Sequence, residues 1–267
     1  FCRDRDRTME IWNGYRAGPE GAVSEYDSDD AFPISDIDEI LPGLIEGSER
    51  VYYDLGHDSE FDRRLMGWVN SIRERVRSGA HPPGEFVALA HHLHDLRLFK
   101  SAAESKLMRK AASISAGAHV RAMQSVKPGM MEYQLEAEYI HEFMRHGSRS
   151  PAYPSIVGGG ANGCILHYIE NSQKLKDGDL VLVDAGCELE HYASDITRTF
   201  PVNGTFSKPQ QALYELVLAS QHAAIAATHP DNHWNVPHEK VVHILTPRLL
   251  DLRLLKGEII EQVETEG

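Results

Sequence analysis

Basic residues, cysteines and long apolar runs are all scarce in this chain of 267 residues. The 27 Lys and Arg stand against 40 Asp and Glu, and the resulting net charge of −13 repels phosphate backbones and anionic lipid. No apolar run approaches the roughly 20 residues that a bilayer-spanning helix needs. We therefore expect neither nucleic acid nor a membrane among its partners.

The three cysteines, Cys2, Cys164 and Cys187, are too few for a disulfide scaffold and form no CxxC motif. We expect them to be free thiols, which are typical of a reducing compartment, so the sequence favours the cytoplasm. The chain begins with Phe1 and shows no basic segment followed by an apolar one, as a secretory signal would. We expect the natural start to lie upstream.

Length and composition predict two globular domains, because 42% hydrophobic and 25% charged residues are ordinary values for chains that bury a core. The first domain mixes a strand near 51–53 with a helix over about 61–76. Between positions 20 and 60 it holds thirteen acidic residues and one Arg, which we interpret as a solvated negative face. A loop with Gly and two Pro at 78–84 precedes the boundary, and we place the domains at 1–95 and 96–267.

Two helices open the second domain. Ser101 and Glu104 have the spacing of a capping box ahead of an apolar series with helical period, and Lys-Pro-Gly at 127–129 ends that helix. A second helix covers about 132–146, with Gly147 where a terminating glycine is expected.

Short β-type runs follow these helices, separated by turns that contain glycine, and they predict a meandering, largely antiparallel sheet. The runs are 156–157, 164–168, 180–184 and 191–200. Further helices are predicted over 207–228 and 239–252.

An apolar run, LVLVDAG at 180–186, contains Asp184, and Asp195 follows eleven residues later. A carboxylate beside the core needs a cation, a metal or hydrogen-bond donors. If the chain turns back after position 185, Asp195 on the returning strand faces Asp184, and two such carboxylates suit Mn²⁺ or Mg²⁺. The alternative is an ordinary turn at Asp184 with Asp195 paired to Arg198.

Histidines and glycines offer weaker signals. His167 ends the predicted strand at 164–168, where it is either an acid–base or hydrogen-bonding group or a structural residue. The run GGGANG at 158–163 lacks the Lys of a P-loop, so we interpret it as allowing close approach of backbone to a ligand or another strand. The run HEKVVH at 238–243 spaces its histidines five apart, unlike the zinc motif HExxH, and predicts no metal site.

Three ordered blocks carry a resemblance to a known family: NGCILHY at 162–168, DGDLVLVDAGCE at 177–188 and DITRTFPVNG at 195–204. With LFKS at 98–101, EF at 142–143 and EIWNG at 10–14, the sequence resembles the Xaa-Pro aminopeptidases (aminopeptidase P), which are pita-bread dinuclear metallopeptidases. The resemblance implies an α+β fold. Its C-terminal part would be an incomplete pita-bread (creatinase/aminopeptidase-like) domain, preceded by part of a ribonuclease-H-like α/β N-terminal domain.

The resemblance also implies a site and a reaction. Asp184 and Asp195 correspond to ligands of two Mn²⁺ ions, with Asp195 bridging them. His167 corresponds to the histidine that binds substrate and stabilises the tetrahedral intermediate, and Trp12 to an aromatic residue lent to a neighbouring subunit's pocket. The implied activity is two-metal hydrolysis of the N-terminal Xaa-Pro bond in peptides with proline second, by a homodimer or homotetramer.

The family completes its metal set with one His and two Glu further along, beyond Gly267. Three of the five expected ligands are then absent, and the first part of the N-terminal domain is absent too. We therefore expect an inactive internal piece of such an enzyme, or the product of an interrupted gene, that binds metal weakly. Two alternatives stay open: a non-catalytic pita-bread module that binds peptides or proteins and, within the family, a prolidase, which acts on dipeptides.

Overall fold

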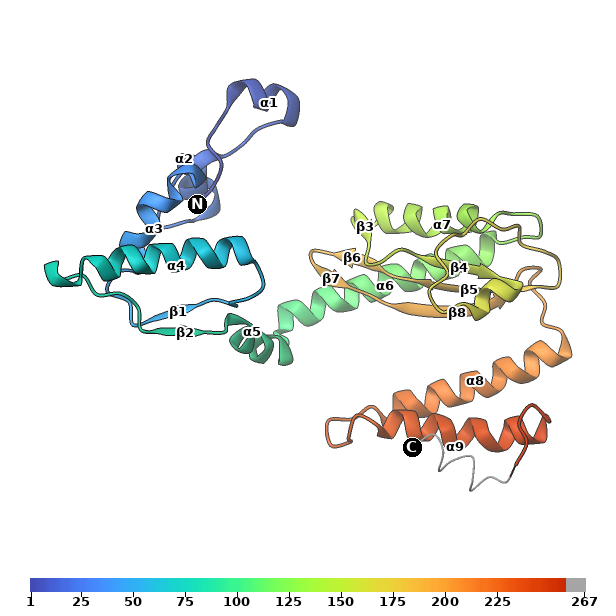
Figure 1. The fold of residues 1–267 in the computed structure, drawn as a ribbon. Helices are drawn as coiled ribbons and strands as arrows, with labels where there is room; N and C mark the ends of the chain where they lie inside the picture. The colour runs from blue at the N-terminus through green and yellow to red at the C-terminus, as the bar shows by residue number, and fades with distance from the viewer. Residues whose placement is uncertain (258–267) are drawn as a thin grey trace. The chain divides into compact units, whose positions relative to one another are not determined.

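The computed structural model of the chain describes residues 1–257. Its contacts divide the chain into two compact units, Phe1–Lys100 and Ser101–Gly267. Each unit mixes helices with short strands (Figure 1). Across residues 1–257, no helix combines the length and the apolar composition that a membrane crossing requires.

The first unit is built on two parallel strands and the helix that connects them. β1 (Arg50–Tyr52) pairs with β2 (Glu85–Val87), and α4 (Ser59–Glu74) lies between them in sequence. These elements confirm the predicted strand near 51–53 and the helix that follows it. The remaining elements are α1 (Arg7–Asn13), α2 (Gly18–Tyr26), η1 (Ile34–Asp36), α3 (Ile37–Ile45), η2 (Val76–Ser78) and α5 (Leu89–Leu98).

Trp68 lies in the small apolar core of this unit. Its side chain is 5% exposed and packs with Ile37 and Leu65. The indole N–H donates to Asp38 Oδ1 at 2.8 Å, so the buried donor has a partner. The core thus joins α3 to α4.

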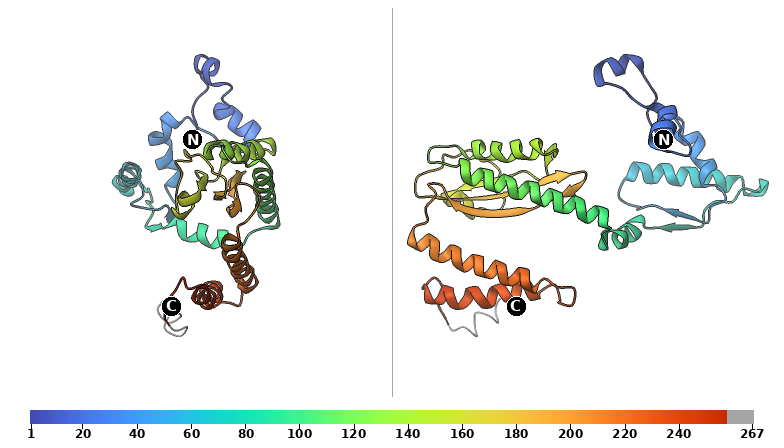
Figure 2. Two further views of the ribbon diagram at one scale, coloured as in Figure 1. Left: turned by 90° about the vertical axis from the view of Figure 1, so that its right-hand side faces the viewer. Right: turned by 180° about the vertical axis from the view of Figure 1, so that it is seen from behind.

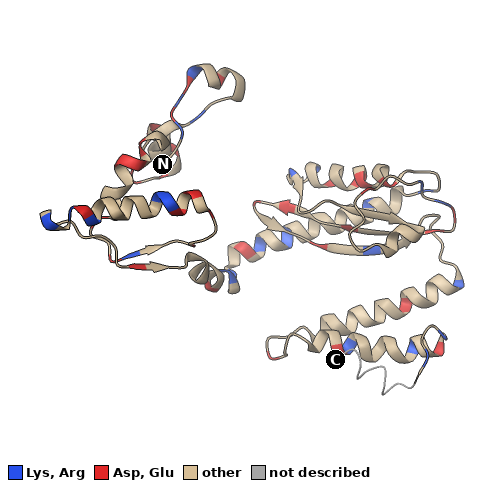
Figure 3. Cartoon of the chain, viewed as in Figure 1, with Lys and Arg blue, Asp and Glu red and all other residues tan. Residues whose placement is uncertain are grey.

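The acidic segment 20–60 is partly paired, which the sequence interpretation missed. Arg64 binds Asp38 at 3.0 Å and Arg75 binds Glu46 at 2.9 Å, in both cases from outside the segment. Figure 3 shows acidic and basic residues interspersed along α4. Because these pairs are exposed, solvent screens them and they contribute little to the stability of the unit.

The second unit opens with the two predicted helices. α6 (Ala102–Ser125) begins with the predicted capping box: Glu104 N–H donates to Ser101 Oγ at 3.2 Å, and Ser101 N–H donates to the Glu104 carboxylate at 2.6 Å. α7 (Glu132–Arg145) ends before Gly147, whose φ of +93° confirms its role as a helix terminator. Figure 2 shows both helices on one side of the strands.

The strands of the second unit pair in antiparallel fashion, as predicted. β4 (Ile156–Gly159), β5 (Leu180–Ala185) and β8 (Ile196–Pro201) form one sheet with β5 in the middle. A second sheet consists of β3 (Ser150–Pro151), β6 (Cys187–Leu189) and β7 (Tyr192–Ala193).

β5 with β8 and β6 with β7 share one register, so residues 180–201 form a long hairpin. Glu190 and His191 form the two-residue turn that closes the hairpin. Both have positive φ, as the central residues of a type I′ turn do. Along β5 the side chains alternate between two faces, and Val181 and Val183 are buried with the apolar residues of α6 and α7. Asp184 lies on the other, partly exposed face. The alternative that placed Asp184 in a turn is therefore wrong.

Residues 164–168 are not the predicted strand. β4 is followed by the 3₁₀-helix η3 (Gly160–Cys164) and then by a turn. Gly158 and Gly163 pack backbone against backbone, since a Cβ on Gly158 would lie 2.7 Å from the nitrogen of Gly163. This close approach turns the chain back on itself. Gly163 also lies close to β5, since a Cβ on it would be 3.3 Å from Leu182 Cβ, which agrees with the expected close approach of the glycine-rich run to another strand.

The two C-terminal helices are confirmed. α8 (Lys208–Ala227) and α9 (Val236–Asp251) pack side by side (Figure 2). α9 begins slightly earlier than predicted, with Pro237 in its first turn, where proline is favoured.

Candidate functional site

The two carboxylates singled out in the sequence meet at one hydroxyl group. Tyr153 Oη lies 2.5 Å from Asp184 Oδ1 and 3.0 Å from Asp195 Oδ1. Asp184 comes from β5, and Asp195 comes from the residue that precedes β8. The hairpin therefore brings both carboxylates to the same point on the partly exposed face.

Gly186 makes this convergence possible. A Cβ at this position would overlap the carbonyl oxygen of Ser194, so only glycine fits between the two arms of the hairpin. The carbonyl oxygen of Gly186 also accepts from Ala152 N–H at 2.8 Å. That bond brings the segment that carries Tyr153 next to the carboxylates.

Tyr153 acts as a donor to this pair. Burial of its ring, and then the hydrogen bonds to Asp184 and Asp195, raise the pKa of Tyr153 well above its ordinary value. The hydroxyl therefore keeps its proton at neutral pH. Within residues 1–257, no ion pair joins Asp195 to Arg198, whose guanidinium donates instead to the carbonyl oxygen of Thr197 at 2.8 Å.

The donor set fits part of a divalent-cation site. Two carboxylates on a partly exposed face provide the oxygen ligands that Mn²⁺ and Mg²⁺ prefer. In the described part of the chain, no group of three or more His, Cys, Asp or Glu side chains lies close enough together to hold a metal ion. Among residues 1–257 the pair therefore offers two carboxylates, and a metal ion at this point would need further ligands.

His167 lies in the exposed turn after η3. Its neighbour Tyr168 is buried and anchors the turn. η3 lies against β5, because a Cβ on Gly163 would be 3.3 Å from Leu182 Cβ, and Leu182 shares a face with Asp184. No hydrogen bond or ion pair among residues 1–257 joins His167 to either carboxylate.

Glu132, at the start of α7, is a fully buried carboxylate that was not predicted from the sequence. Its oxygens accept four hydrogen bonds from residues between positions 159 and 173. The only local signal was an acidic residue in the first turn of a predicted helix, where its negative charge interacts favourably with the helix dipole. Nothing in that signal indicates burial.

Trp12 belongs to the first unit and lies on α1, where its side chain is 80% exposed. Local contacts hold the segment that carries α1, which we call the projecting segment: Asp6 caps α1, and Arg5 forms an ion pair with Glu10 at 3.0 Å. Gly14, with φ of +80°, ends the helix. Trp12 is therefore presented to solvent by an ordered segment.

An apolar groove of about 540 Å³ lies between α8 and the sheet. Leu180, Leu182 and Thr197 line it from the strands, and Leu213 and Val217 from α8. Thr197 is the register partner of Asp184, so the groove continues the sheet face that carries the carboxylates.

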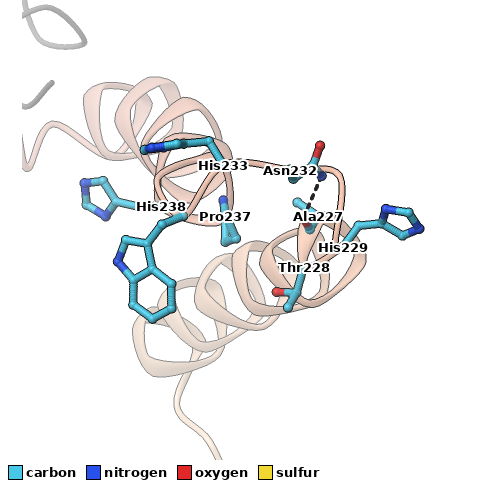
Figure 4. A pocket seen from close by; sticks show the side chains of 8 residues that line it. Ala227, Thr228, His229, Asn232, His233, Pro237 and His238 are labelled. Carbon is cyan, nitrogen blue, oxygen red and sulfur yellow. Dashed lines mark hydrogen bonds between the residues drawn. The ribbon is translucent and has the colours of Figure 1, made fainter. Parts of the chain in front are cut away.

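A second hollow, of about 490 Å³, lies where α8 meets α9 and contains three histidines. Figure 4 shows that His229 points to the opposite side from His233 and His238. These imidazoles do not converge, and they form no metal group among the described residues.

Comparison with known proteins relates the whole chain to one group. The family model of metallopeptidase family M24 matches residues 106–259, and the aminopeptidase P N-terminal domain matches residues 1–52. The Xaa-Pro aminopeptidase of Escherichia coli (strain K12) is 42% identical over 263 residues, which are 98% of this chain and 60% of that protein.

Solved structures give the same result. Pseudomonas aeruginosa aminopeptidase PepP matches with a TM-score of 0.95 and 58% identity, over 100% of this chain and 60% of that one. A zinc-substituted E. coli aminopeptidase P in complex with product matches with a TM-score of 0.94 and 42% identity, over 99% and 60% of the two chains. The chain spans about 60% of the length of these relatives.

These matches confirm the predicted α+β fold, a pita-bread domain preceded by part of an aminopeptidase P N-terminal domain. The M24 match alone covers more than half of the chain. The resemblance to the Xaa-Pro aminopeptidases is confirmed, and the chain belongs to metallopeptidase family M24.

Proposed function

We propose that this protein removes the N-terminal residue from peptides whose second residue is proline, by metal-dependent hydrolysis. The observation that carries the proposal is the convergence of Asp184 and Asp195 on Tyr153, in a chain of family M24. Because the chain spans about 60% of its relatives, we assign this activity to the full-length protein.

Asp184 and Asp195 are the residues of this chain that would hold two Mn²⁺ ions. When bound, such ions polarise the substrate carbonyl and lower the pKa of water. Tyr153 donates to both carboxylates, which holds their side chains in the converging orientation. Tyr153 is thus proposed to keep the ligand pair ordered.

His167 is the proposed substrate-binding and catalytic histidine. Its imidazole lies in an exposed turn and is accessible to a peptide, while the buried Tyr168 next to it anchors the backbone of the turn. A hydrogen bond from this ring to the oxygen that gains charge in the transition state is the role that we assign to it.

Trp12 is proposed to enter the pocket of a neighbouring subunit in a homodimer or homotetramer. The support is its exposure on an ordered projecting segment, because exposed tryptophans held in place make effective interface anchors.

The domain assignment 1–95 and 96–267 stays a proposal, and its boundary falls within α5. The cytoplasm is the proposed compartment. Its support is that Cys2, Cys164 and Cys187 are all free thiols, as predicted.

The test compares Ala-Pro-Ala with Ala-Ala-Ala as substrates of the full-length protein in Mn²⁺. We expect free alanine from the first peptide only. Asp195→Asn should abolish both cleavage and metal occupancy, measured by metal analysis, because it removes a proposed metal ligand. Asp231→Asn, a matched change in the exposed turn between α8 and α9, should alter neither. Full activity and occupancy in Asp195→Asn would contradict the assignment.

The same assay separates the alternatives. A prolidase would cleave the dipeptide Ala-Pro in preference to Ala-Pro-Ala. A non-catalytic binding module would retain peptide binding without cleavage at any metal concentration, although the presence of Asp184, Asp195 and His167 favours an enzyme.

A further inference from the structure

Glu132 is a buried carboxylate whose side-chain partners all lie in one segment of the chain. Its side chain is 0% exposed. Oε1 accepts from Gly159 N–H at 2.8 Å and Asn162 Nδ2 at 3.1 Å. Oε2 accepts from Tyr168 Oη and Gln173 N–H, each at 2.8 Å. These bonds span residues 159–173, the segment that leaves β4 and carries η3 and His167.

All four partners are donors, so the carboxyl group of Glu132 serves only as an acceptor. No basic side chain within residues 1–257 forms an ion pair with it. Neutral donors alone therefore satisfy a carboxylate in the protein interior, and bonds to such an acceptor are the stronger kind. If the carboxylate were lost, the partly buried N–H groups of Gly159 and Gln173 would lose the acceptor that they share.

The backbone at both ends of segment 159–173 also lies close to Glu132. Glu132 N–H donates to the carbonyl oxygen of Gln173 at 2.9 Å, which closes the end of the segment. At its start, a Cβ on Gly159 would lie 2.6 Å from Leu175 Cδ2 and 3.4 Å from Glu132 Oε1. Glycine at 159 therefore lets the strand end approach the carboxylate directly.

The segment that Glu132 holds is the one that bears His167. The Tyr168 hydroxyl donates to Glu132, so the residue after His167 is fixed in the core. At the other end, η3 packs on Leu182, which shares a sheet face with Asp184. Glu132 thus connects the anchor of the histidine turn to the strand that carries one carboxylate.

We propose that Glu132 is a positioning residue that, through Gly159 and Tyr168, holds His167 on the face of Asp184 and Asp195. This inference rests on the proposed function, because it takes His167 as the residue that acts on substrate. Glu132 touches neither substrate nor metal ligands and acts through the turn.

The first experiment measures amide hydrogen exchange in the 267-residue chain. Glu132→Gln replaces an acceptor-only group with an amide whose NH₂ faces donors. We expect exchange at residues 160–172 to accelerate about tenfold or more, with amides of α6 and β5 unchanged. Glu138→Gln is the matched control on the same helix, where the side chain pairs with Arg121 near the surface. Unchanged exchange at 160–172 in Glu132→Gln would overturn the proposal.

If Glu132→Gln does not fold, Tyr168→Phe replaces it. This variant removes a single bond to the carboxylate and keeps the aromatic ring. Faster exchange confined to residues 160–172 supports the proposal, and exchange equal to that of the wild type overturns it.

The second experiment is a double-mutant cycle in the full-length protein. We expect Glu132→Gln to lower kcat about tenfold with KM within about twofold, a size typical of residues that support a site from outside it. In a His167→Ala background the same change should cost less than about twofold, because its route of action is gone. Full additivity would overturn the positioning role. An inactive wild type would instead refute the proposed function, and exchange would still show whether Glu132 holds the segment.

Discussion

The carboxylates of Asp184 and Asp195 share one hydrogen-bond donor, Tyr153, which belongs to no recognised sequence motif. Tyr153 lies 31 and 42 residues from them in sequence, and its hydroxyl contacts both. A neutral donor beside two acids keeps the pair stable while no cation is present, since each carboxylate has a partner. Tyr153 therefore supports both carboxylates in the folded chain.

Tyr153→Phe tests this. Removing the hydroxyl leaves both carboxylates without their shared donor, so we expect the 267-residue chain to lose about 1–3 kcal/mol of unfolding free energy. Urea unfolding measures the loss. Tyr133→Phe, at an exposed position of α7, is the control and should change little. Equal stability of the two variants would show that Tyr153 does not support the pair.

His119 links the two helices to the hairpin. Its Nε2 lies 2.8 Å from the carbonyl oxygen of Ile196, and its Nδ1 lies 2.8 Å from the Tyr139 hydroxyl. The carbonyl accepts only, so Nε2 carries the proton and the neutral ring is satisfied at both nitrogens. Burial lowers the pKa of His119 below its ordinary value of 6.5.

A pH dependence follows from this buried ring. Below pH 6.5 the unfolded chain binds a proton at His119 that the folded chain resists, so the free energy of unfolding falls as pH decreases through 6.5. We expect the stability difference between wild type and His119→Gln to shrink from pH 7.5 to 5.5. Urea unfolding at several pH values measures it, and comparison with the variant cancels the other histidines. Parallel pH profiles would contradict the prediction.

The long hairpin is the element that creates the site, and Gly186 controls it. A side chain there meets the backbone of Ser194 on the opposite arm. We expect Gly186→Ala to destabilise β5 and β8 by about 3 kcal/mol or more, since backbone must move to relieve the overlap. Amide exchange of these strands measures the change. Gly67→Ala, in α4 where a Cβ meets nothing within 4 Å, should leave them unaffected.

Elements with local signals were predictable from sequence, and elements shaped by distant contacts were not. α6 and α7 carry their signals in the capping box at Ser101 and in Gly147, and the apolar run at 180–183 marks β5. The turn at 164–168 was mistaken for a strand because its shape depends on glycine packing. The same limit hid Glu132, whose side-chain partners are 27 to 41 residues away.

At the scale of the whole molecule, the affinity for metal depends on how many ligands the chain brings together. The described residues bring two carboxylates together, and no group of three ligands is found among them. We expect calorimetric titration of the 267-residue chain with Mn²⁺ to show weak binding, because two carboxylates leave each ion mostly hydrated. Asp184→Asn should remove even this binding. Two tight sites in the 267-residue chain would contradict the expectation that further ligands are needed.

The positions of the three tryptophans give the protein a built-in optical reporter. Trp68 is in the core of the first unit, whereas Trp12 and Trp234 are 80% and 90% exposed. Iodide in solution should therefore quench two of the three indoles in the folded chain, and the fluorescence that survives would come from Trp68. Its red shift on denaturation would report the unfolding of Phe1–Lys100 alone, so this unit can be followed independently of the second one.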